Sequence, residues 1–163
     1  MFLHRKPNDP KMVYLDQFQW INLSKAYYQR SDWKRFAAAL EDVREAVAQK
    51  RARFPLSDSH VTETMKHGDL KRRQRLALVM AEISQGWSIA PLHTVTPQEL
   101  LPELAKTFHK PPILTPPIVF GQGIEFAFGA QLRVPEFLKL LNSSDPWKRQ
   151  KGIRLLASLL IDV

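Results

Sequence analysis

A short apolar run that ends in an acid constrains the fold of this chain more than any other feature. Residues 12–15 read Met-Val-Tyr-Leu, and Asp16 follows them directly. Four continuous apolar residues suit a buried strand of a parallel sheet and are too few to form one face of an amphipathic helix. Helical patterns follow the run, so the order of elements predicts a mixed α/β domain. Open parallel sheets of this class bind ligands beyond the carboxyl ends of their strands.

Asp16 has two interpretations that the sequence leaves open. A carboxylate is costly to remove from water unless it meets a cation, a hydrogen-bond donor or open solvent. Asp16 could therefore bind a metal ion at the end of the strand. It could also cap the helix that follows, because aspartate is one of the preferred N-cap residues.

The composition is that of one globular domain. The chain has 163 residues, of which 44% are hydrophobic and 25% charged, and this is enough to build a core. The absence of cysteine excludes a disulfide framework and thiolate-bound zinc. The sequence contains neither an apolar run of about 18 residues nor the apolar centre of a signal peptide. We therefore expect a cytoplasmic protein with no membrane partner.

The charge of the chain indicates a polyanionic partner. The formal net charge is +8 and the isoelectric point is near 9.9. Nucleic acid is the simplest such partner, and an acidic protein would also explain the charge. The densest basic cluster could bind phosphates or form a solvated helix face. It comprises Lys66, His67, Lys71, Arg72, Arg73 and Arg75, and a second basic face comprises Lys148, Arg149, Lys151 and Arg154.

Apolar spacing predicts several helices separated by short extended pieces. Thr96 to Glu99 carries the signals of a helix start, with an N-cap, a first-turn proline and an acid at the third position. Residues 109–129 are rich in proline and glycine and predict a long loop or insertion. Within that loop we expect extended pieces at 118–120 and 124–128. The predicted helices lie at about 18–30, 32–52, 59–65, 69–85, 135–142 and 146–160, and a second strand at 87–90. On the helix at 69–85, we expect an inward-facing stripe of Leu76, Val79, Met80 and Ile83.

A second segment that suggests chemistry lies at residues 55–63, which read Pro-Leu-Ser-Asp-Ser-His-Val-Thr-Glu. On a helix, His60 and Glu63 would be neighbours on one face. Magnesium prefers oxygen ligands and keeps several waters, so two converging carboxylates can form a working site. Asp16 and Glu63 could supply them. Glu63 could instead be a solvated surface acid, and for His60 a hydrogen-bonded or exposed side chain is favoured over metal ligation.

These segments resemble a known family. Residues 13–23 are similar to the opening strand and helix of PIN-like nucleases, in which an apolar strand delivers an acid. Residues 56–63 resemble the second motif of that family, where a glutamate at a helix start joins the aspartate. Residues 73–86 suit the helix that follows, so the likeness covers about residues 12–90.

The resemblance implies one PIN-like domain over residues 1–163, with a small, mostly parallel sheet flanked by helices. It also implies that Asp16 and Glu63 are catalytic residues and metal ligands. In this family the acids hold Mg²⁺ or Mn²⁺, which activates water to cut an RNA phosphodiester. RNA would then be the partner, with its backbone held by Lys66, Lys71, Arg72, Arg73 and Arg75.

The sequence departs from the PIN-like pattern at the third acid. Asp145 is expected to cap a helix, and Asp162 is the penultimate residue. One interpretation is a domain without its C-terminal part. Another is a non-catalytic basic module that binds nucleic acid or an acidic protein. A third is a structural chain whose apolar edge at 118–128 docks onto another chain or a second copy.

Aromatic residues near the first helix also have two interpretations. They could stack on unpaired bases or pack into the core, and core packing is favoured for most of them because they fall at helical spacing. They are Phe18, Trp20, Tyr27, Tyr28 and Trp33.

Overall fold

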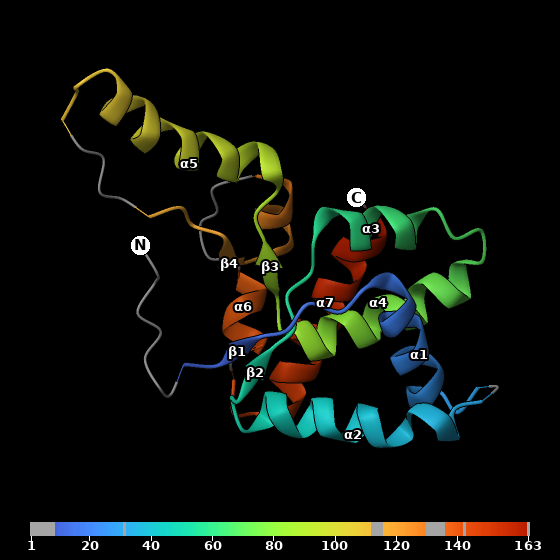
Figure 1. Ribbon diagram of the computed structural model, residues 1–163. Helices are drawn as coiled ribbons and strands as arrows, with labels where there is room; N and C mark the ends of the chain where they lie inside the picture. The colour runs from blue at the N-terminus through green and yellow to red at the C-terminus, as the bar shows by residue number, and fades with distance from the viewer. Residues whose placement is uncertain (1–8, 31, 112–115, 130–135, 142, 163) are drawn as a thin grey trace.

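Helices dominate the computed structural model, which describes residues 9–30, 32–111, 116–129, 136–141 and 143–162 (Figure 1). The strands are short and lie among the helices. In chain order the elements are β1 (Lys11–Met12), α1 (Gln17–Tyr27), α2 (Lys34–Ala48), β2 (Ala52–Arg53), α3 (Asp58–Met65), α4 (Leu70–Ser84), β3 (Trp87–Ile89), α5 (Leu92–Thr107), β4 (Phe120–Gln122), the 3-10 helix η1 (Ile124–Phe128), α6 (Glu136–Leu141) and α7 (Pro146–Asp162).

The β structure consists of two short pairs joined by one bridge. β1 and β2 are parallel, and β3 and β4 are antiparallel. A parallel bridge between Leu56 and Ser88 connects the two pairs. Pro55, which has no backbone N–H to donate, lies between β2 and this bridge and interrupts the ladder. The helix-rich mixed α/β class predicted from the sequence is confirmed.

The first strand is shorter and less buried than the apolar run predicted. β1 ends at Met12, and the Val13 N–H still donates to the Arg53 carbonyl oxygen at 2.9 Å. The chain then runs on to Asp16. Along an extended segment of this kind, successive side chains point to opposite faces. Val13 and Leu15 are half-buried, whereas Tyr14 is 55% exposed. Only one face of the run is covered, so a fully buried strand at residues 12–15 is wrong.

The main core lies where α1, α4 and α7 pack together. Trp20 on α1 and Leu156 on α7 are both fully buried. α2 covers the outside of α1 and buries only Leu40 in full. The stripe predicted to face inward on α4 is confirmed, because its members are at most 6% exposed: Leu76, Val79, Met80 and Ile83.

α5 begins earlier than the sequence signals predicted. It starts at Leu92, and Pro97 and Pro102 lie inside it. The N–H groups of Thr94 and Val95 donate to the Pro91 carbonyl oxygen, so the first turn forms directly after β3. The predicted start at Thr96 is therefore wrong, because the Pro91 carbonyl oxygen already accepts the first hydrogen bonds of the helix.

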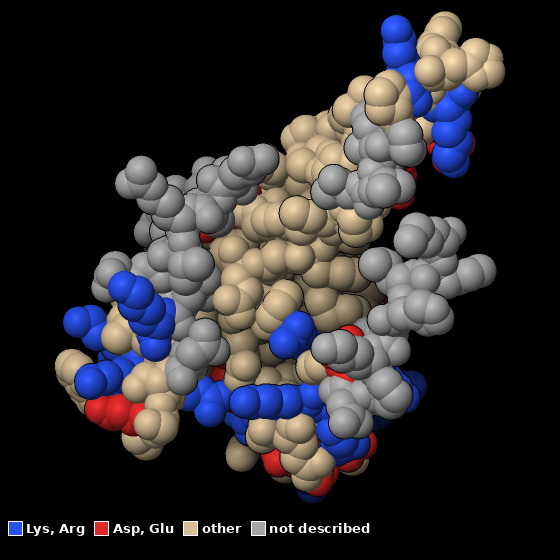
Figure 2. Space-filling view, turned by 90° about the vertical axis from the view of Figure 1, so that its left-hand side faces the viewer, with Lys and Arg blue, Asp and Glu red and all other residues tan. Residues whose placement is uncertain are grey.

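α5 projects from the body of the molecule (Figure 1) and leaves apolar side chains exposed. Figure 2 views the molecule from the left-hand side of Figure 1 and shows few charged side chains across the middle, with Lys and Arg gathered toward the periphery, most of all along the lower edge. The exposed apolar side chains of α5 and the segment through β4 and η1 include Leu92, Leu100, Leu101, Leu104, Phe108, Ile118, Phe120 and Phe128. Within the described part of the chain, none of the helices combines the length and apolarity that a membrane crossing requires.

The predicted extended piece at 124–128 is wrong, because these residues form η1. Gly123 has φ of +106° and Gly129 has φ of +82°. Glycine adopts such angles at little cost, so the backbone can turn sharply at both ends of η1. The turn buries Ile124 and Ala127. The other predicted extended piece, at 118–120, overlaps β4 at Phe120.

Candidate nucleic-acid interface

Asp16 is the N-cap of α1. Its carboxylate accepts a hydrogen bond from the Gln19 N–H at 2.8 Å. The Gln19 side chain in turn accepts from the Asp16 N–H at 2.8 Å, which completes a capping box. The capping interpretation of Asp16 is confirmed, and the residue is exposed at the surface.

His60 joins the segment between β1 and α1 to α3. The ring is 1% exposed, and its Nδ1 accepts from the Ser57 N–H at 2.9 Å. Nε2 therefore carries the proton and donates to the Leu15 carbonyl oxygen at 2.7 Å. Burial lowers the pKa of His60, so the ring is neutral at pH 7 with both nitrogens in use. The hydrogen-bonded interpretation of His60 is confirmed.

The Leu15–His60 bond brings the predicted acidic residues into one region. Burial is the main influence on the pKa of His60, and the carboxylates of Glu63, Asp16 and Asp58 oppose it. All three therefore lie within electrostatic reach of the ring. Among the residues that the structure describes, no group of three or more His, Asp or Glu side chains could hold a metal ion. The metal role of Asp16 and Glu63 stays a prediction.

Of the two later acids, the structure describes the side chain of Asp145 alone. Asp145 caps α7, as expected, because its carboxylate accepts from the Trp147 N–H at 2.9 Å. The side chain of Asp162 lies outside the described part of the structure.

A basic hollow of about 750 Å³ lies between α1 and α4. Three of the predicted phosphate-binding residues line it, namely Lys71, Arg72 and Arg75 of α4. Lys25 of α1 and Arg30, just after α1, also line it, and neither was predicted from the sequence. The full lining of the basic hollow is Ile21, Ser24, Lys25, Tyr28, Arg30, His67, Asp69, Lys71, Arg72, Arg75 and Leu76.

The electrostatics of the basic hollow favour an anion. Its lining contains five Lys or Arg side chains and one carboxylate, Asp69. Asp69 is the N-cap of α4 and accepts from the N–H groups of Arg72 at 3.2 Å and Lys71 at 2.9 Å. These bonds lower its pKa and keep it charged, so it offsets only one of the five cations. The Arg75 guanidinium lies over the Tyr28 ring, 5.6 Å from its centroid. This cation–π contact holds the guanidinium against the lining of the basic hollow.

The other two predicted phosphate-binding residues are not part of this lining. Lys66 is the exposed C-cap of α3. Arg73 donates from Nη1 to the Met65 carbonyl oxygen at 3.4 Å, which directs it toward the end of α3. Helical spacing explains the division, because position 73 falls on a different face of α4 from positions 71, 72 and 75.

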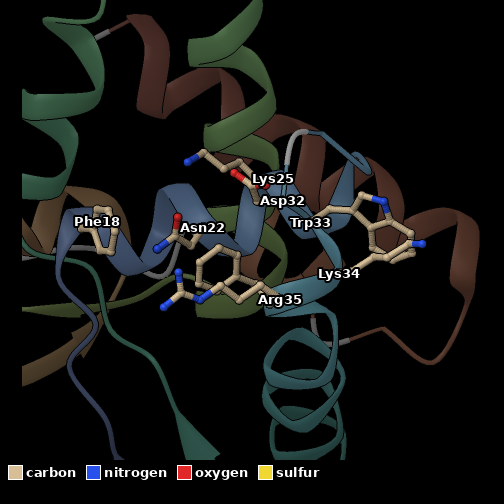
Figure 3. Close-up of a pocket in the computed structure, with 8 residues that line it drawn as sticks. Phe18, Asn22, Lys25, Asp32, Trp33, Lys34 and Arg35 are labelled. Atoms are coloured by element: carbon tan, nitrogen blue, oxygen red, sulfur yellow. The ribbon is translucent and has the colours of Figure 1, made fainter.

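A second hollow of about 760 Å³ shares Lys25 with the first. We call it the aromatic hollow, because three of its lining residues are aromatic. Figure 3 shows that Phe18, Asn22 and Lys25 extend from α1, whereas the other labelled residues come from the turn before α2 and its first turn. Its full lining is Phe18, Asn22, Lys25, Asp32, Trp33, Lys34, Arg35 and Phe36.

Comparison with known proteins finds no matching family model, no matching curated protein and no matching solved structure. The PIN-like resemblance therefore stays a prediction, and the proposals below rest on the geometry of the chain itself.

Proposed function

We propose that the protein binds nucleic acid, RNA in particular, through the basic hollow between α1 and α4. One observation supports the proposal above all. Two separate parts of the chain place five cationic side chains around one hollow, and its one lining carboxylate, Asp69, caps α4 and pairs with Arg72 at 3.4 Å. The chain as a whole carries a net charge of +8, which would draw a polyanion toward the molecule.

The physical basis of this binding is the release of counterions from the phosphate backbone. Each phosphate that a Lys or Arg neutralises releases condensed cations, so affinity falls as salt rises. For a single strand the slope of log affinity against log salt is about −0.7 per phosphate contact. Backbone contacts of this kind do not read sequence.

The test replaces two cations of the basic hollow together. The variant Lys71→Ala with Arg72→Ala removes two charges and leaves the backbone N–H groups that Asp69 caps. Its affinity for an RNA oligonucleotide should fall, and the salt slope should become shallower by about 0.7 for each lost contact.

The matched control is Lys148→Ala with Arg149→Ala. These residues also lie in the first turns of a helix that an aspartate caps, and both are exposed. The control should retain the affinity and salt slope of the unmodified protein. An equal loss in both double variants would mean that net charge alone drives binding, and the assignment to the basic hollow would be wrong.

A second candidate function is Mg²⁺- or Mn²⁺-dependent cleavage of RNA at Asp16 and Glu63. It is supported by the 2.7 Å bond from His60 to Leu15, which holds the residue before Asp16 against α3, and by the influence of both carboxylates on that ring. Two carboxylates with several waters are a ligand set that Mg²⁺ accepts. A bound ion would stabilise charge on the phosphate and lower the pKa of a coordinated water.

The variant Asp16→Asn tests the metal role separately from the capping role, because asparagine is an equally good N-cap. Metal-dependent cleavage should be lost while the variant stays folded, and Mn²⁺ binding measured by titration calorimetry should weaken. Asp42→Asn, at an exposed position on α2, is the control. Unchanged cleavage by pure Asp16→Asn protein would reject the assignment.

Protein docking is the alternative that the exposed surface of α5 favours. Leu101, Leu104 and Phe108 follow one another at helical spacing and are 53%, 49% and 66% exposed. Exposed apolar stripes often mark contacts with another chain. Light scattering tests this role directly: a dimer would support docking between copies, and a strictly monomeric protein would count against it.

A further inference from the structure

We infer that the aromatic hollow is a nucleobase-binding subsite, and that the nucleic acid bound by this protein is therefore single-stranded. The inference rests on the proposed function, because Lys25 lines both hollows and would contact a strand that passes from one to the other. The bases of a duplex are stacked and paired inside the helix. Only an unpaired strand could place phosphates in the basic hollow and a base in the aromatic hollow.

The aromatic residues of the hollow provide a surface on which a base can stack. Phe18 is 67% exposed, although the neighbouring α1 aromatic, Trp20, is fully buried. Trp33 and Phe36 are half-buried and line the same hollow. Stacking of bases on such rings tolerates any sequence, because every base presents a flat π surface.

Asn22 provides an independent observation that points to a ligand. The residue is 5% exposed and lines the aromatic hollow, yet its buried Oδ1 has no hydrogen-bond partner. Buried polar atoms of folded proteins are nearly always paired, because an unpaired one costs free energy. An exocyclic amino group of an entering base would supply the missing donor. Carboxamide side chains are well suited to base edges for this reason.

The arrangement along α1 fits one nucleotide after another. Phe18, Asn22 and Lys25 are spaced so that they share a face of the helix (Figure 3). The hollow also carries Lys34 and Arg35, against one acid, Asp32. A base held between Phe18 and Asn22 would leave its phosphate near these cations and near Lys25, which leads into the basic hollow.

The experiment measures binding of three fluorescent probes of equal length by anisotropy: single-stranded RNA, the corresponding duplex and an abasic single strand. The unmodified protein should bind the single-stranded RNA about tenfold more tightly than the abasic strand, which has the same phosphates and no bases. Phe18→Ala should remove this advantage, lowering affinity for the RNA by about tenfold and leaving the abasic strand unchanged.

Phe108→Ala is the matched control, because Phe108 is 66% exposed, is the C-cap of α5 and lines neither hollow. It should bind all three probes like the unmodified protein. Both phenylalanines are exposed, so each variant should keep its fold, which circular dichroism verifies.

The outcomes separate this inference from the proposed function. Equal binding of RNA and abasic strand, together with weaker binding by the Lys71→Ala, Arg72→Ala variant, would overturn the base subsite and leave the proposed function standing. If Phe18→Ala lowers the affinity for single-stranded RNA and the Lys71→Ala, Arg72→Ala variant does not, the base subsite is supported and binding at the basic hollow is contradicted. Absence of binding to every probe would overturn both.

The role of Asn22 has its own test in base composition. Cytosine carries an exocyclic amino group where uracil carries a carbonyl oxygen, and the two rings have the same size. An oligo(C) probe should therefore bind about fivefold more tightly than oligo(U), the effect of one hydrogen bond. Equal affinity for the two probes would overturn the assignment of Asn22.

Discussion

His60 donates a hydrogen bond of 2.7 Å from Nε2 to the carbonyl oxygen of Leu15, 45 residues earlier in the chain. The bond fixes Leu15, the residue that precedes Asp16, against the first turn of α3. Nδ1 accepts from the Ser57 N–H at the same time, and this acceptor role requires a neutral ring. Protonation of the ring at Nδ1 would break that second bond.

Acid should therefore destabilise the fold through His60. Burial lowers its pKa below the ordinary value of 6.5, so the unfolded chain takes up the proton more readily than the folded one. The stability that the neutral ring contributes is complete above pH 6.5 and is lost as pH falls through the lower pKa of the folded state. Urea unfolding at about pH 7.5 and about pH 5 measures the loss.

His60→Gln removes the titrating group, so the acid-induced loss of stability should be smaller in this variant. His109→Gln, at an exposed position, is the control and should behave like the unmodified protein. An acid-induced loss in His60→Gln as large as in the unmodified protein would show that other groups are responsible.

The cap formed by Asp16 makes a measurable contribution to stability. Asp16→Ala removes the acceptor for the Gln19 N–H and should lower the free energy of unfolding by about 1 kcal/mol. Asp16→Asn should cost much less, because the amide oxygen can accept the same bond. Thermal and urea unfolding of both variants distinguish a cap from a charge effect. If the two variants lose the same stability, the carboxylate charge rather than the cap is what matters.

Two glycines should respond in opposite ways to alanine. A Cβ at Gly152 in α7 would lie 2.8 Å from the Leu141 backbone nitrogen, where α6 packs against α7. Overpacking of this kind costs about 1–3 kcal/mol, more than the gain of about 1 kcal/mol in helix propensity. Gly152→Ala should therefore lower the melting temperature.

A Cβ at Gly68 would meet nothing within 4 Å. Gly68→Ala should raise stability by about 0.4–1 kcal/mol, through the lower entropy of the unfolded chain. Differential scanning calorimetry compares the two variants. Stabilisation by Gly152→Ala would show that α6 does not pack on α7 as described.

Lys25 should contribute to the binding of single-stranded nucleic acid, since it lines both hollows. Lys25→Ala should weaken this binding and make its salt slope shallower by about 0.7. Lys148→Ala is the control for loss of one charge. If the salt slope is identical in the two variants, Lys25 is not part of the interface. Anisotropy titrations at several salt concentrations provide the slopes.

The helices were the most predictable part of the fold. The α4 stripe from Leu76 to Ile83 is buried as its spacing predicted, because periodicity along a helix is a local property. Local signals failed where tertiary contacts set the backbone. Thr96 carries every feature of a cap, yet Pro91, shortly after β3, is the N-cap of α5, and the helix starts one turn earlier.

The candidate site was predicted only in part for the same reason. Lys71, Arg72 and Arg75 stand out as a run of charge, and three of the five predicted residues do line the basic hollow. Lys25 and Arg30 gave no comparable signal, since each is an isolated cation near a helix end.

The sequence by itself determined the helix-rich mixed class, the basic character and the inward stripe of α4, because composition and periodicity depend only on neighbours along the chain. The tertiary structure decided which cations share a hollow, because α1 and α4 are brought together by burial of Trp20 and Met80, about 60 residues apart. It also decided that His60 is held by Leu15 and not left to solvent. A buried polar ring takes whichever partner the packing provides, and no local pattern names that partner.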